Sequence, residues 1–249
     1  MQLFYCKDIT PEGYCTLDAE ESRHAVRVLR LRNGDEINVT DGRGNMYRCQ
    51  IVEANEKECG LTPLPPLLER EGEMDSLAGK RARVRLHLAV APTKNPSRME
   101  WLVEKAVEIG VGEITLLQCD HSERSFLKTD RLERLAVSAM KQSLHLWLPC
   151  INPAVSLRSW LHSQSTAPGS QLRFIAHCEA DKPRTPLATA MESGRDAVVL
   201  IGPEGDFSSE EIALALECGF RPVSLGPSRL RTETAALYSV CAFNLINDR

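Results

Sequence analysis

The chain has 249 residues, of which 43% are hydrophobic and 26% charged, and its formal net charge is −4. This ordinary globular composition excludes a disordered, collagen-like or low-complexity protein, and no apolar run approaches the roughly 18 residues of a membrane-spanning helix. The acidic balance argues against a protein that coats nucleic acid indiscriminately, but it leaves room for a local basic patch. Because Met1–Asp8 lack a basic stretch followed by an apolar core, we expect no signal peptide and a cytoplasmic protein.

Nine cysteines are spread along the chain, and no pair has the C-x-x-C spacing. Their odd count and scattered positions argue against a disulfide framework and against a zinc site. We therefore expect small, buried and reduced thiols, several of them in apolar segments, and no bound metal.

Short β segments are predicted in the first part of the chain. Residues 37–40 alternate and run into the turn signal Asp41-Gly-Arg-Gly, and residues 46–52 follow as the return strand. Residues 18–30 have the spacing of a short helix with Ala25, Val28 and Leu29 on one face. A small β-barrel or partly open sheet is the natural interpretation.

A linker is predicted next, because residues 62–79 combine clustered prolines with acidic and small residues that show no period. We place a domain boundary near residue 75, between a first domain at 1–75 and a second at 76–249. In the second domain strands alternate with helices, which predicts a mostly parallel α/β sheet with ligand loops at the carboxyl ends of its strands. The expected strands are 83–91, 113–119, 172–178, 197–201 and 222–225, and the expected helices are 98–109, 130–148, 187–193, 208–218 and 232–247.

Two loops of this domain have the composition of ligand sites. Ile201-Gly-Pro-Glu-Gly-Asp-Phe joins a buried strand to a helix with the capping box Ser208-x-x-Glu211. Its glycines allow close approach of backbone to a ligand, and the N–H groups of the helix start suit an anion. A plain strand-to-helix turn remains the alternative.

The second loop, 225–231, opens the last helix. Thr232 and Glu233 also fit a simple helix cap, whereas capping does not explain Arg229 and Arg231. The chain holds neither a P-loop nor a dinucleotide-binding glycine motif.

Basic residues are clustered locally in two regions. Solvated surface charge is one interpretation, and contact with RNA phosphates is the other. The clusters are Arg23, Arg27, Arg30 and Arg32 with His24 beside them, and Lys80, Arg81, Arg83 and Arg85 followed by Lys94 and Arg98.

Several sequence motifs along nearly the whole chain together indicate one protein family, although each motif alone is weak evidence. They are Arg23-His-Ala-Val-Arg-Val-Leu-Arg-Leu-Arg-Asn-Gly-Asp-Glu-Ile, Lys94 with Arg98-Met-Glu-Trp-Leu-Val-Glu-Lys-Ala-Val-Glu-Ile-Gly-Val, Gln142-Ser, Ile201-Gly-Pro-Glu-Gly and Leu230-Arg-Thr-Glu-Thr-Ala. With these segments in order, the chain resembles the bacterial 16S ribosomal RNA (uracil-N3) methyltransferase family, a branch of the SPOUT superfamily.

The resemblance implies an α/β fold in which a PUA-like RNA-binding β-barrel precedes a SPOUT domain, whose parallel sheet carries a deep trefoil knot. It implies a homodimeric enzyme that uses S-adenosylmethionine and binds neither metal nor membrane. The implied reaction is methylation of N3 of one uridine near the decoding site of 16S rRNA, in the assembled small ribosomal subunit.

The resemblance also implies residue roles. Arg231 would stabilise charge on the uracil oxygens, and Glu233 and Glu204 are both candidate bases, between which the sequence does not choose. The cofactor-binding residues would be His177, Cys178, Ile201, Gly202, Pro203, Glu204, Gly205, Leu225, Gly226, Leu230, Thr232, Thr234 and Ala235. The RNA-binding residues would be Arg23, His24, Arg27, Arg30, Arg32, Lys94, Arg98, Arg124 and Gln142.

The chain departs from the family pattern at two places. Asp206 stands where a second glycine is expected, and Leu144-His145 stand where Gly-Arg is expected, which leaves His145 as a replacement substrate contact. Two other readings stay open, a methyltransferase for ribose 2′-hydroxyls and an RNA-binding or assembly module without catalysis. The β-barrel and the Arg-Thr-Glu-Thr loop argue against the first, and the intact glycine loops and Arg231 argue against the second.

Overall fold

The structure, a computed structural model, describes residues 2–10, 12–65, 84–123, 128–165, 171–179 and 183–247. It divides into two compact units, one of Met1–Ala82 with Met140–Leu148 and one of Arg83–Ala139 with Pro149–Arg249. The boundary proposed near residue 75 lies outside the described residues and stays a prediction. No helix among the described residues is long and apolar enough to cross a membrane.

The first unit is built on a five-stranded sheet of order β1-β3-β4-β5-β2. β1 runs parallel to β3, and the other neighbours are antiparallel. The expected hairpin is confirmed as β3 and β4, whose turn is held by the Asp41 carboxylate accepting from the Arg43 N–H at 2.8 Å. The strands are β1 (Leu3–Tyr5), β2 (Cys15–Thr16), β3 (Glu36–Thr40), β4 (Met46–Glu53) and β5 (Gly60–Pro63).

The short helix of this unit is confirmed as α1 (Ala19–Arg23), which Asp18 caps with its side chain. It continues as a π-helical turn, η1 (His24–Val28), in which the Leu29 N–H donates to the His24 carbonyl at 3.0 Å. The wider turn rotates the following positions relative to an α-helix. Val28, expected on the apolar face, is consequently 66% exposed, whereas Ala25 is buried.

The helix expected over 130–148 ends earlier, because α4 (Thr129–Gln142) closes in a left-handed residue. Leu144 has φ of +58°, and the His145 N–H donates to the Met140 carbonyl at 3.0 Å. This is a Schellman closure with leucine at the position that glycine usually occupies. The departure from the family pattern at Leu144 therefore keeps the backbone conformation that glycine would favour.

The segment after this closure packs within the first unit. The Leu148 N–H donates to the Gly42 carbonyl at 2.8 Å, and the Gly44 N–H donates to the Leu146 carbonyl at 2.9 Å. Gly44, with φ of +97°, lies directly against the Trp147 ring, so any side chain there would overlap the indole. Lys141 pairs with the buried Glu21. The sequence pattern had placed residues 140–148 in the second domain.

The second unit contains a seven-stranded sheet of order β10-β12-β9-β11-β6-β7-β8, in which all neighbours are parallel. The α/β class with a parallel sheet is thereby confirmed, while the trefoil knot stays a prediction. The strands are β6 (Leu86–Val90), β7 (Glu113–Gln118), β8 (Cys150–Ser156), β9 (Leu172–Ala176), β10 (Thr185–Pro186), β11 (Ala197–Ile201) and β12 (Arg221–Ser224).

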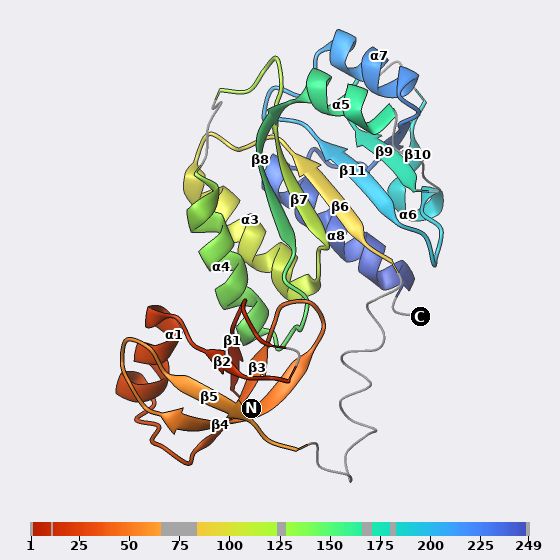
Figure 1. Cartoon of the computed structure of the whole chain (residues 1–249). Helices are drawn as coiled ribbons and strands as arrows, with labels where there is room; N and C mark the ends of the chain where they lie inside the picture. The colour runs from red at the N-terminus through yellow and green to blue at the C-terminus, as the bar shows by residue number, and fades with distance from the viewer. Residues whose placement is uncertain are drawn as a thin grey trace. The chain divides into compact units, whose positions relative to one another are not determined.

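Helices cover both faces of this sheet, α5 and α7 on one and α3 and α8 on the other (Figure 1). Side chains along each strand point alternately to the two faces of the sheet, and Leu200 of β11 packs on the face covered by α5 and α7. Local signals mark two helix boundaries as expected: Ser208 and Glu211 form the capping box that begins α7, and Gly110 ends α3 with φ of +107°. The helices are α3 (Pro96–Ile109), α5 (Leu157–Ser165), α6 (Leu187–Ala190), α7 (Ser209–Glu217) and α8 (Thr232–Asn247).

Sequence patterns missed the pair β8 and α5. β8 is an edge strand that includes Pro153 and is only partly buried, so it lacks the continuous apolar run of a central strand. The cysteines are all free. Most of those in apolar segments are buried, but Cys150 and Cys178 are exposed, contrary to the general expectation of buried thiols.

Candidate functional site

A cavity of about 910 Å³ opens where β9, β11 and β12 end. Because parallel strands end at the same edge of a sheet, the loops that follow them converge there. All of the predicted cofactor residues line this cavity except Gly205 and Thr234. The two loops singled out in the sequence thus form one site, together with the end of β9.

The glycines of the first loop serve different purposes. A Cβ on Gly202 would lie 3.1 Å from the Phe207 ring, and one on Gly205 would lie 3.0 Å from the Cβ of His121. Gly205 therefore makes room for His121 of the same unit, and not for a ligand as the sequence suggested. The His121 ring nitrogen Nδ1 lies 3.2 Å from the Gly205 carbonyl oxygen.

Gly226, in the second loop, lines the cavity in a left-handed conformation with φ of +111°. A Cβ at this position would meet no atom within 4 Å, so the backbone faces open space. This is the arrangement expected where a chain leaves room for a ligand.

The helix start after this loop differs from the simple cap considered in the sequence. The Ala235 N–H donates to the Arg231 carbonyl at 2.8 Å, so Arg231 takes the cap position and Thr232 is the first helical residue. The Thr232 hydroxyl instead donates to the Gly202 carbonyl at 3.1 Å. This bond ties the two loops together at the base of the cavity.

The three candidate catalytic residues are placed differently. Arg231 and Glu204 line the cavity, and Glu233 does not. Glu204 accepts from the Lys94 N–H at 3.0 Å. The buried Glu233 places one carboxylate oxygen 3.6 Å from the Arg98 guanidinium, and its other oxygen has no hydrogen-bond partner among the described residues.

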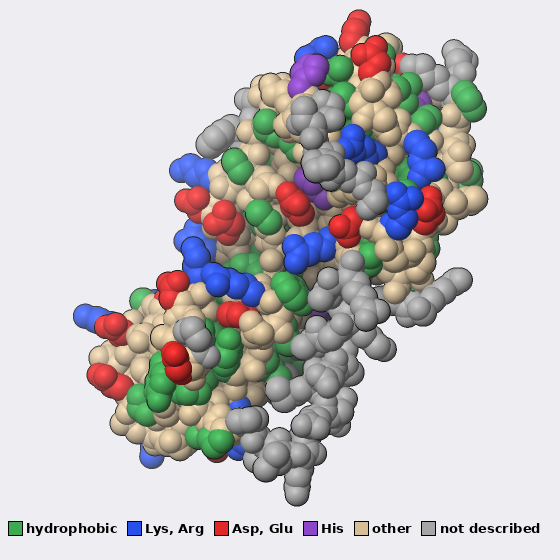
Figure 2. All heavy atoms as spheres, turned by 45° about the vertical axis from the view of Figure 1, so that its right-hand side comes forward, with side chains coloured by type: hydrophobic (Ala, Val, Ile, Leu, Met, Phe, Trp, Pro, Cys, Tyr) green, Lys and Arg blue, Asp and Glu red, His purple; other side chains and the backbone are tan. Residues whose placement is uncertain are grey.

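Two of the predicted RNA-binding residues lie beside these carboxylates in the second unit. Arg98 is the partner of Glu233. The exposed Lys94 places its ammonium 2.7 Å from Glu123, and this hydrogen bond raises the pKa of Lys94. Figure 2 shows basic and acidic side chains interspersed over the visible face of this unit, in keeping with the small net charge. Arg124 lies outside the described residues.

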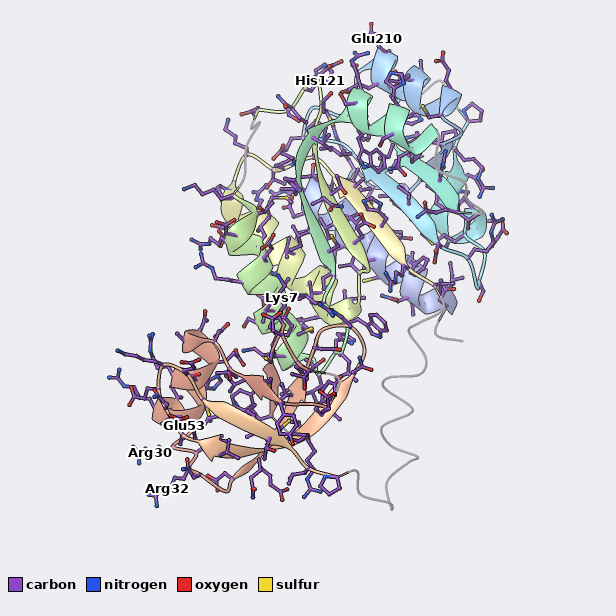
Figure 3. All side chains as sticks on the ribbon, viewed as in Figure 1. Lys7, Arg30, Arg32, Glu53, His121 and Glu210 are labelled. Atoms are coloured by element: carbon purple, nitrogen blue, oxygen red, sulfur yellow. The ribbon has the colours of Figure 1, made fainter. Side chains whose placement is uncertain are left out.

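The remaining basic candidates belong to the first unit, where they lie on α1, on η1 and in the segment that follows η1. The ring of His24 packs against Phe4 with centroids 5.9 Å apart, and Arg30 is left-handed with φ of +60°. Arg30 and Arg32 extend away from the body of the unit (Figure 3). Gln142 is also exposed and belongs to this unit. The exposed arginines are Arg23, Arg27, Arg30 and Arg32.

A parallel sheet with a cavity of this size at the carboxyl ends of its strands defines an α/β enzyme domain that binds a small organic ligand. The chain belongs to the RNA methyltransferase family. The family model described as RNA methyltransferase domain matches residues 80–244, and the one described as RNA methyltransferase PUA domain matches residues 17–64. The resemblance stated from the sequence motifs is thereby confirmed.

Individual relatives agree with this assignment. A crystal structure of a probable rRNA-methyltransferase from Porphyromonas gingivalis is 40% identical, with a TM-score of 0.85, over 100% of this chain and 99% of that one. A methyltransferase from Legionella pneumophila, solved with its bound cofactor SAM, is 26% identical with a TM-score of 0.79, over 99% and 98% of the chains. Ribosomal RNA small subunit methyltransferase E of Synechocystis is 29% identical, over 94% of this chain and 74% of that protein.

The described residues contain no group of three or more His, Cys, Asp or Glu side chains arranged to hold a metal ion.

Proposed function

We propose that this protein transfers the methyl group of S-adenosylmethionine to N3 of a uridine near the decoding site of 16S rRNA, in the assembled small ribosomal subunit. The observation that carries the proposal is the convergence of the 202–207 and 225–231 loops on one cavity that also holds Arg231. A relative with bound SAM and another named for the small ribosomal subunit support the cofactor and the substrate.

The cavity fits S-adenosylmethionine in size and lining. Ile201, Leu225 and Leu230 offer an apolar surface for the adenine, and Gly226 leaves open space beside it. His177 and Cys178, at the end of β9, complete the wall. When bound, S-adenosylmethionine supplies an electrophilic methyl group.

The residues of the site suit a reaction at uracil N3. The proton on N3 is weakly acidic and has to leave before or during the transfer, so negative charge develops on O2 and O4 of the base. The Arg231 guanidinium is the group that stabilises this charge. Between the two candidate bases, the position of Glu204 in the cavity favours it as the proton acceptor. Glu233, buried against Arg98, is better suited to position that arginine.

The RNA would be held by basic side chains of both units. Exposed arginines of the first unit contact phosphates together with Gln142 of the same unit, and Lys94 and Arg98 contribute from the second unit. Arg124, in the same set, stays a prediction.

We also propose that two copies associate through α3 and α8. Several apolar side chains of α8, such as Ala236, Val240 and Phe243, are buried in the core of the unit. The exposed apolar residues on these packed helices are instead Trp101 and Tyr238, which are 45% and 43% exposed, and Leu245. Such side chains are enriched in the cores of protein interfaces.

One assay tests the reaction. The protein is incubated with labelled S-adenosylmethionine and small ribosomal subunits from a strain that lacks the modification, and the rRNA is digested and analysed by mass spectrometry. We expect 3-methyluridine at a single site. A 2′-O-methyl nucleoside would instead support the ribose methyltransferase reading, and cofactor binding without any methylation would show that the substrate or its assembly state is wrong. Failure to bind the cofactor would favour the RNA-binding module. Naked 16S rRNA serves as the matched substrate control.

A further inference from the structure

One peptide group in the cavity wall is held by charged side chains at both of its ends. The peptide joins His177 to Cys178, directly after β9, and both residues line the cavity. The Arg184 guanidinium donates to its carbonyl oxygen. The Asp206 carboxylate accepts from its N–H at 2.7 Å. Because a peptide group is planar, bonds at both ends determine the orientation of the whole unit.

Asp206 is built to make this contact. Its own N–H donates to the Pro203 carbonyl at 2.9 Å, and its second carboxylate oxygen accepts from the Phe207 N–H at 2.9 Å. Its φ of +65° lies in the left-handed region, which aspartate tolerates better than most residues. The residue thus keeps the backbone shape expected of glycine at this position and adds a carboxylate that glycine lacks.

We infer that Asp206 and Arg184 are positioning residues, which lock the His177–Cys178 peptide and so shape the cofactor side of the cavity. The inference rests on the proposed function, since it assigns the locked peptide to S-adenosylmethionine binding. Hydrogen bonds to charged groups are stronger than neutral ones, so the lock keeps the end of β9 in place before the cofactor arrives. Preorganisation of this kind raises affinity because less motion is lost on binding.

The test compares Asp206→Asn, Asp206→Gly and Arg184→Met with the wild-type protein. Asparagine has one acceptor oxygen where aspartate has two, so one of the two N–H groups loses its partner. Glycine fits the left-handed backbone and removes both bonds. We expect Arg184→Met and Asp206→Asn to bind S-adenosylmethionine roughly tenfold more weakly by calorimetry, which is the effect of losing one hydrogen bond to a charged group, and Asp206→Gly, which loses two, to bind it at least as weakly. At saturating cofactor we expect kcat close to the wild-type value.

Glu210→Gln is the matched control, because it removes the same charge from the nearby start of α7. Glu210 points outward into solvent (Figure 3). Its variant should bind the cofactor as the wild type does. Wild-type affinity in Asp206→Gly would overturn the inference, since glycine would then supply everything the position needs. An equal loss of cofactor affinity in Glu210→Gln would also overturn it, because negative charge near the cavity would then matter more than the hydrogen bond from the Cys178 N–H to Asp206.

A second measurement uses the protein without cofactor. In hydrogen–deuterium exchange, the Cys178 amide should exchange faster in Asp206→Gly, which has no acceptor for it, and at the wild-type rate in Glu210→Gln. An unchanged rate in Asp206→Gly would overturn the lock. If the wild-type protein itself does not bind S-adenosylmethionine, the proposed function fails, and the exchange rates still decide whether the two side chains lock the peptide.

Discussion

Thr232 donates its hydroxyl to the Gly202 carbonyl oxygen at 3.1 Å, and both residues are buried. The bond joins the first residue of α8 to the first residue after β11, which are far apart in the sequence. It fixes the distance between the two loops that form the cavity. A single side chain therefore links the two motifs that the sequence presents separately.

Replacing this threonine by valine keeps the shape of the side chain and removes the donor. The Gly202 carbonyl would then be buried without this partner, so we expect Thr232→Val to lower the free energy of unfolding by about 1–3 kcal/mol. Urea unfolding measures the loss. Thr189→Val, on the exposed surface of α6, should change stability by less than about 0.5 kcal/mol. Equal losses in the two variants would contradict the prediction.

Arg231 is expected to act on the transition state and not on the cofactor. Arg231→Ala should lower kcat by about a hundredfold or more, as is typical when a group that stabilises developing charge is removed. Its affinity for S-adenosylmethionine should change little. The comparison is Arg229→Ala, which removes the same charge from the same loop. Intact turnover in Arg231→Ala would refute the role, and equal effects of both variants would assign it to the charge of the whole loop.

His87 makes the stability of the second unit depend on pH. Burial lowers the pKa of His87 below its ordinary value of 6.5, and the Glu113 carboxylate partly opposes this shift. The ring contacts the Thr115 hydroxyl at 2.7 Å and packs edge-on against Trp160. The unfolded chain binds a proton at His87 more readily than the folded protein does. The stability that the buried, neutral His87 ring contributes is therefore complete above pH 6.5, and it is lost as the pH falls through the lowered pKa of the folded state.

We therefore expect His87→Gln to lose less stability than the wild type between about pH 8 and about pH 5. Chemical unfolding at both ends of this range gives the comparison. The same slope in His87→Gln and the wild type would show that other groups are responsible.

Alanine substitutions at two glycines of the first unit distinguish the cost of backbone strain from the cost of steric overlap. Gly34 and Gly44 have φ of +95° and +97°. A Cβ on Gly34 would meet nothing within 4 Å, whereas one on Gly44 would overlap the Trp147 ring. Alanine should cost about 1–2 kcal/mol at either position from the left-handed backbone alone. Gly44→Ala should cost roughly 1–3 kcal/mol more, because the indole has to move.

Thermal or urea unfolding of the two alanine variants measures this difference. Gly34→Ala is itself the control, since it carries the same backbone strain without the overlap. Equal destabilisation would mean that the Met140–Leu148 segment does not pack on the 42–44 turn. A larger loss in Gly44→Ala would support that packing.

Most of the central strands and the longer helices could be predicted from local patterns. Continuous apolar runs such as Ala197–Ile201 and capped helices such as Ser209–Glu217 show their nature within a few residues. The β8–α5 pair could not be predicted in this way, because an edge strand needs no strong apolar pattern. The end of α4 was hidden for a related reason, since a leucine closes it where glycine is the usual signal.

By itself, the sequence determined the α/β class, the family and the two loops of the site, because these depend on periodicity and on motifs that are contiguous in the chain. Tertiary structure alone decided what each loop residue does. It placed Gly205 against His121, Glu233 against Arg98, and the Asp206 carboxylate against the Cys178 N–H. These partners are distant in sequence and meet because parallel strands end at one edge of the sheet, and no local pattern records which side chains will face each other there.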